Sequence, residues 1–177
     1  MKKTLFPLLI MVTSITTLYI ISFFLPSVYK TKDSIVIHAK SDSVFSYLID
    51  IKKWKDWSFW IHKNDPNVEF VYEGNPIGNG SIMRWKNTRS GAGKLQIIET
   101  WEPSFLKYNL QKEYGEQKTT GSFELKETGG NTSLIWTNEE FIGSDPFSKY
   151  TKFFLFYFEK SKFKQSLHDI KKEIEKN

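Results

Sequence analysis

The strongest constraint on the fold is a change in hydrophobic period after residue 67. From Val68 to Glu140 apolar and polar residues alternate, in short segments separated by glycine-rich or proline-containing turns, which is typical of consecutive antiparallel strands. Asp145 and Pro146 then supply the start of a helix, and Phe163, Leu167 and Ile170 continue it at helical spacing. The pattern predicts an antiparallel sheet followed by one long helix.

The segments before the alternating region complete an α+β architecture. Residues 34–38 are predicted as a strand, and Ser41 and Asp42 as the cap of a helix whose apolar side includes Val44, Phe45 and Leu48. The final helix is expected to cross the concave face of the sheet. With 177 residues, one domain with a full core and a short extra segment is the expected organisation.

The short extra segment is the amino terminus, where residues 5–25 form an apolar run without charge after Lys2 and Lys3. A run of about 20 apolar residues is long enough for a bilayer. We therefore predict a single-pass transmembrane anchor over residues 1–29 and a domain over residues 30–177. The two lysines favour a cytoplasmic amino terminus and an extracytoplasmic domain. The alternative is a cleaved signal peptide, although no small-x-small cleavage pattern follows the run.

Composition excludes several classes of chemistry. The chain has no cysteine, so disulfides, thiolate catalysis and cysteine-ligated metals are excluded. The histidines, His38, His62 and His168, lack the spacing of a metal site, so no metal or cofactor is expected. The net charge is +5, but basic and acidic residues are interspersed, which disfavours nucleic-acid binding. Phosphate-binding loops and nucleophile elbows are also missing from the sequence.

Aromatic residues make up 16% of the chain, which is a large share. Trp54, Trp57 and Trp60 have a spacing of three and form either part of the core, a lid over a cavity, or a surface that enters lipid. The run from Phe153 to Phe158 is too continuous for one helix face, so part of it must meet a cavity, a membrane or a partner.

Several segments resemble the START-like superfamily, also called SRPBCC, and within it the polyketide cyclase/dehydrase-like and lipid-transport-like proteins. The resemblance covers residues 25–175. The segments that carry it are Leu25-Pro26-Ser27, residues 34–39 leading into Val44-Phe45, Trp54-x-x-Trp57-Ser58-x-Trp60, Asp65-Pro66-Asn67, Gly78-x-Gly80, Trp85, the strand from Gly93 to Glu99, and residues 132–136. Phe59 departs from the family, where proline is frequent at this position. The resemblance implies a helix-grip fold, with the sheet wrapped around the final helix and a cavity between them.

Strand parity indicates which side chains face that cavity, because positions two apart share a face. Glu99 shares parity with Leu95 and Ile97, so in a regular strand its carboxylate would point inward. It would then serve as a ligand anchor or a general base. The alternative is a residue at the rim of the cavity that forms an ion pair. Arg84 has the opposite parity. The predicted ligand-binding residues are Met83, Trp85, Ile97, Glu99, Tyr108, Trp136, Phe153 and Tyr157.

Three functions are compatible with these features. The favoured one is a non-enzymatic module that binds a hydrophobic or amphipathic small molecule, such as a lipid, beside a membrane contacted through residues 5–25. The second is a cyclase-like or hydrolase-like enzyme with Glu99 as base and Tyr108 as hydrogen-bond donor. The third is a membrane-associated interaction protein that docks a partner through its aromatic surface. The sequence leaves the oligomeric state open.

Overall fold

The structure is a computed structural model, and it describes residues 2–61, 67–87, 91–112 and 118–176. It does not describe the side chains of residues 2–5, Asn87 or Tyr157. His62 therefore lies outside the described residues.

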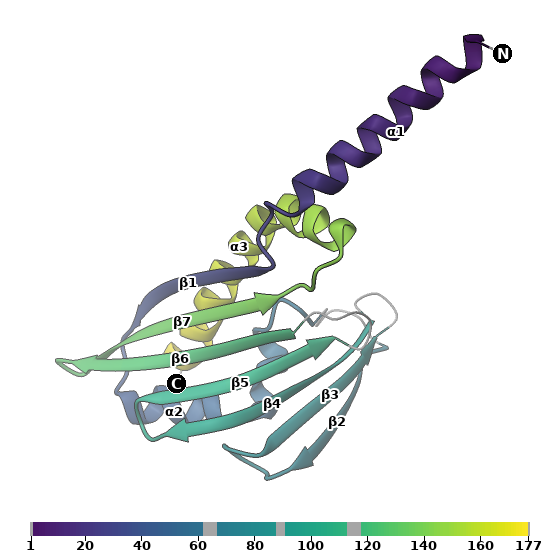
Figure 1. The fold of residues 1–177 in the computed structure, drawn as a ribbon. Coiled ribbons are helices and arrows are strands. Elements are labelled where there is room, and N and C mark those ends of the chain that lie inside the picture. Colours follow the sequence, from purple (N-terminus) through teal and green to yellow (C-terminus); the bar gives the residue numbers. More distant parts are fainter. Residues whose placement is uncertain (1, 62–66, 88–90, 113–117, 177) are drawn as a thin grey trace.

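Seven antiparallel strands form one sheet in the order β1-β7-β6-β5-β4-β3-β2 (Figure 1). The strands are β1 (Val28–Ile37), β2 (Glu69–Gly74), β3 (Ser81–Asn87), β4 (Gly91–Trp101), β5 (Phe105–Lys112), β6 (Lys118–Thr128) and β7 (Asn131–Phe141). Strands β2 to β7 form the predicted meander, and β1 closes on β7 with Val28 opposite Phe141. The first strand is longer than predicted, because pairing with β7 continues over its polar residues.

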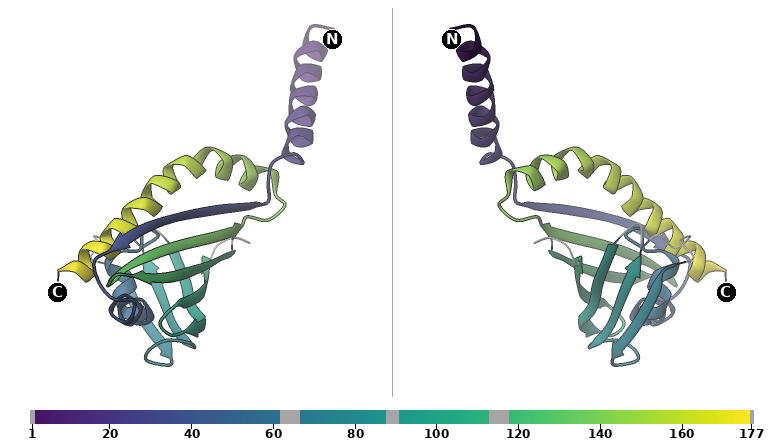
Figure 2. Two further views of the ribbon diagram at one scale, coloured as in Figure 1. Left: turned by 90° about the vertical axis from the view of Figure 1, so that its left-hand side faces the viewer. Right: turned by 90° about the vertical axis from the view of Figure 1, so that its right-hand side faces the viewer.

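The helices cover one face of the curved sheet (Figures 1 and 2). They are α2 (Ser41–Ile49), the short 3₁₀ helix η1 (Ile51–Asp56) and α3 (Pro146–Glu175). The Asp145 side chain accepts a hydrogen bond from the Ser148 backbone N–H at 2.7 Å, which confirms the predicted start of the long helix. The α+β helix-grip prediction is thereby confirmed for the domain.

The cap predicted for α2 is wrong. Lys40 occupies the N-cap position and makes no side-chain cap, while the Glu127 carboxylate of β6 accepts from both the backbone N–H and the hydroxyl of Ser41. A negative charge at a helix N-terminus also interacts favourably with the helix dipole. The start of α2 is therefore stabilised by a strand that lies far from it in the sequence.

At the amino terminus, helix α1 (Lys2–Ser22) extends away from the domain (Figures 1 and 2). Within the described parts of the chain, we found no helix with enough length and apolar character to cross a membrane. The predicted transmembrane span is thus not confirmed.

Candidate functional site

An aromatic block occupies the space between the sheet and the second half of α3. Its rings come from η1 and the residues after it, from three strands and from α3: Trp54, Trp57, Phe59, Trp60, Tyr108, Phe123, Trp136 and Phe163. The Trp136 and Phe163 rings stack with centroids 4.0 Å apart, and Trp57 meets Trp136 edge-on at 5.5 Å. Ring pairs at these separations are in direct contact. The three tryptophans at spacing three are therefore buried core residues.

A short hydrogen-bond chain runs through the block. Trp136 Nε1 donates to the Tyr108 hydroxyl at 2.9 Å, and that hydroxyl donates to Asn138 Oδ1 at 2.7 Å. Gly121 makes room for it, because a Cβ there would lie 2.1 Å from Tyr108 Cζ. Burial raises the pKa of the Tyr108 hydroxyl far above its ordinary value, although the hydrogen bonds from Trp136 and with Asn138 act in the opposite direction. Tyr108 is thus part of a buried hydrogen-bond chain that stabilises the core.

Under the first half of α3, the inner face of the sheet becomes polar and holds a buried cation. The side chain of Lys152 is 5% exposed, and its ammonium donates to the carboxylates of Glu140 on β7 and Glu159 on α3. Burial alone lowers the pKa of Lys152, but the two carboxylates outweigh it and the net pKa is raised. We call these three residues the Lys152 cluster. It contains one positive and two negative groups.

A cavity of about 30 Å³ lies beside the Lys152 cluster. Its lining combines polar groups with rings from the block and from α3: Tyr29, Thr31, Phe59, Asn138, Glu140, Lys152, Phe156, Glu159 and Phe163. The Tyr29 hydroxyl is buried and has no hydrogen-bond partner among the described residues. A space of this size holds about one water molecule. Larger hollows, such as one of about 510 Å³ between α2 and the end of α3, open at the surface.

Five of the predicted ligand-binding residues lie together on the inner face of the sheet: Met83, Trp85, Ile97, Tyr108 and Trp136. All are buried in the hydrophobic core, and Trp85 lies against the backbone of Gly93 on the neighbouring strand. Phe153 instead lies on the exposed side of α3, and the side chain of Tyr157 lies outside the described residues.

The inward orientation predicted for Glu99 is wrong, because β4 is not regular. A β-bulge between Ile97 and Glu99 shifts the register, so that Ile97 pairs with Tyr108 whereas Glu99 pairs with Lys107. One extra residue in a strand reverses the face of every residue beyond it. Glu99 therefore shares the outer face with Lys107. Glu99 and Tyr108, the two predicted catalytic candidates, lie on opposite faces of the sheet.

Sequence reasoning missed the Lys152 cluster, although part of the signal was present. The inward parity of Trp136 continues through Asn138 to Glu140, so the same rule, extended along β7, would assign these two polar residues to the inner face. Lys152 directly precedes the aromatic run of α3, and its position in the sequence does not indicate that it is buried. Among the described residues, no group of three or more His, Cys, Asp or Glu side chains is arranged to hold a metal ion.

Comparison with known proteins shows the fold. No family model matches the sequence, and no curated protein matches it either. Solved structures do match. The Zhui aromatase/cyclase from Streptomyces sp. R1128 has a TM-score of 0.61 at 15% identity, covering 84% of this chain and 94% of that one. The structure of Ara h 8.0201 has a TM-score of 0.56 at 15% identity, covering 85% of this chain and 99% of that one.

A third neighbour is Aha1 from Colwellia psychrerythraea, with a TM-score of 0.54 at 13% identity. The match covers 82% of this chain and 96% of that one. The functions that these names indicate are diverse. At these identities the neighbours show only that the domain shares their architecture.

Proposed function

We propose that the domain is a non-enzymatic module that binds an amphipathic small molecule between the first half of α3 and the inner face of β1 and β7. The observation that carries this proposal is the cavity beside the Lys152 cluster, which Tyr29 lines together with aromatic and charged side chains. The buried Tyr29 hydroxyl has no hydrogen-bond partner in the described part of the chain. A buried hydroxyl without a partner is costly, and a ligand that bonds to it removes that cost.

The charge of the site favours one class of polar group. Two carboxylates already surround the Lys152 ammonium, so the cluster is one unit negative when all three groups are ionised. An anionic head group would add to this negative charge inside a poorly hydrated space. The site therefore fits a hydroxyl, amide or ammonium group, with the apolar part of the ligand against Phe59, Phe156 and Phe163.

Binding requires movement of α3, because the cavity itself accommodates about one water. The aromatic block fixes the second half of the helix through Phe163, whereas Phe156 in the first half is only partly buried. The ligand would thus enter by displacing Phe156 and the first half of α3. The enzyme alternative gains no support, since Glu99 and Tyr108 lie on opposite faces of the sheet.

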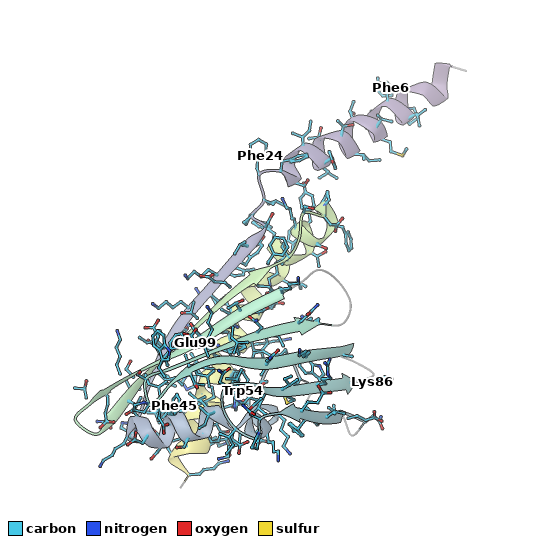
Figure 3. All side chains as sticks on the ribbon, turned by 60° about the horizontal axis from the view of Figure 1, so that its bottom comes forward. Phe6, Phe24, Phe45, Trp54, Lys86 and Glu99 are labelled. Carbon is cyan, nitrogen blue, oxygen red and sulfur yellow. The ribbon has the colours of Figure 1, made fainter. Side chains whose placement is uncertain are left out.

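We further propose that α1 lies in the apolar layer of a lipid bilayer. Exposed large apolar side chains lie on all sides of the helix, from Phe6 to Ile21, and in Figure 3 they stand clear of the domain. The exposed hydroxyls of Thr13, Thr16 and Thr17 donate to carbonyls within the helix. A helix that is apolar around its whole circumference needs an apolar environment on every side. A bilayer provides that environment and is also a source of amphipathic molecules.

The test is native mass spectrometry of the full chain, purified in detergent micelles and exposed to a lipid extract. The variants are Tyr29→Phe, which removes only the cavity hydroxyl, and Tyr72→Phe on β2 as the matched control. We expect a bound amphipathic species in the parent and in Tyr72→Phe, and a reduced bound fraction in Tyr29→Phe. An empty parent, or equal occupancy in both variants, would sink the proposal.

A further inference from the structure

The exposed surface of α3 over residues 146–158 is mostly apolar. Over residues 146–158 the exposed large side chains are Phe147, Phe153, Phe154, Leu155 and Phe158. The two charged residues of this segment, Lys149 and Lys152, are both buried. Soluble surfaces rarely present so many neighbouring large apolar groups, and such patches mark interaction sites. We call this surface the α3 collar.

The α3 collar is joined to α1 by two hydrogen bonds at the end of that helix. Lys149 Nζ donates to the carbonyl of Ser22 at 3.2 Å, and the Tyr150 hydroxyl donates to the carbonyl of Leu18 at 2.7 Å. Ser22 is the last residue of α1, and a cation at the carboxyl end of a helix interacts favourably with the helix dipole. The first turns of α3 thus fix where α1 leaves the domain.

The arrangement in space puts both apolar surfaces at the same end of the molecule. In both views of Figure 2 the first half of α3 forms the crest of the domain, at the level where α1 leaves it. Phe23 and Phe24, which follow α1, are also exposed there. A layer that surrounds α1 would therefore reach the α3 collar as well.

We infer that the α3 collar is a second lipid-contacting surface, held against the bilayer by the Lys149 and Tyr150 contacts, and that the ligand passes from the bilayer under the first half of α3. This deepens the proposed function and rests on its placement of α1 in lipid. Lipid is the occupant because the apolar surface is continuous from all sides of α1 to the collar. A protein partner would cover one side of a protruding helix and leave the others exposed.

The test uses the fact that the chain has no cysteine. Single cysteines at Phe154 and Phe158 in the α3 collar carry an environment-sensitive fluorophore, with Ile10→Cys on α1 reporting insertion and Val71→Cys on β2 as an exposed control. The full-length variants are reconstituted into phosphatidylcholine vesicles with and without a lipid-borne quencher. We expect quenching by the lipid at positions 10, 154 and 158, and none at 71.

The outcomes separate the two proposals. Quenching at position 10 without quenching at 154 and 158 overturns the α3 collar inference and leaves α1 in lipid. If position 10 is not quenched, the placement of α1 in lipid fails, and the collar inference fails with it. A fluorescence shift at 154 and 158 that grows with protein concentration in the absence of vesicles identifies a second copy as the occupant, and this also overturns the inference.

Discussion

Replacing Lys152 with methionine tests whether the Lys152 cluster is held by its central cation. Both carboxylates accept from the same ammonium, so they lie within about 5 Å of each other. Without the ammonium, two charges at ~5 Å repel by about 3 kcal/mol at an effective dielectric constant of about 20. Because Glu140 is 20% and Glu159 33% exposed, water reduces this repulsion, and we expect Lys152→Met to cost about 2 kcal/mol at pH 7.

The assay is urea unfolding of the full chain in detergent micelles, followed by tryptophan fluorescence. Lys160→Met, at an exposed position of the same helix, is the control and should change stability by less than about 0.5 kcal/mol. Adding Glu159→Gln should restore most of the loss at pH 7. A deficit no larger than that of Lys160→Met, or one that Glu159→Gln leaves unchanged, would refute the reasoning.

Three further outcomes are expected from unfolding measurements. Gly121→Ala should cost about 1–3 kcal/mol, because the added Cβ overlaps the ring of a buried tyrosine, whereas Ser122→Ala on the outer face should be nearly neutral. Phe163→Ala removes a ring from the aromatic block and should lower the free energy of unfolding by about 3–5 kcal/mol. Phe154→Ala should lower it little, because that side chain is 67% exposed. Hydrogen bonds from Ser41 at the start of α2 lower the pKa of Glu127. The contribution of Glu127 to stability is therefore present above its unfolded-state pKa and lost as pH falls through its folded-state pKa. The difference in unfolding free energy between the parent and Glu127→Gln should shrink on acidification.

The sequence predicted the domain architecture well, because that architecture follows from local patterns. Alternation along β3, β5 and β7 assigned Met83, Tyr108 and Trp136 to the inner face, where all three are buried. Helical spacing in the second half of α3 assigned Phe163 to the core in the same way. A regular repeat fixes which side chains share a face, so such residues can be placed without knowledge of the tertiary structure.

The candidate site was predicted less well, because it depends on contacts between distant segments. Glu99 was placed on the wrong face since a bulge leaves no clear mark in the sequence. Glu127 caps a helix that begins 86 residues earlier in the chain, a contact that no local pattern indicates. Lys152 stands among aromatic residues, and its two carboxylates become partners only when α3 lies against β7.

The aromatic block also gives the protein an internal optical reporter. Four of the six tryptophans are in it, and the ring centroids of Trp54 and Trp57 are 4.8 Å apart, while those of Trp60 and Trp136 are 5.9 Å apart. Indole rings at such separations share their electronic excitation, so near-ultraviolet circular dichroism reports their mutual orientation. Trp101, by contrast, is exposed at the end of β4, so its signal reports contact with solvent. A change in the coupled signal without a change in backbone dichroism would therefore locate a rearrangement to the block itself.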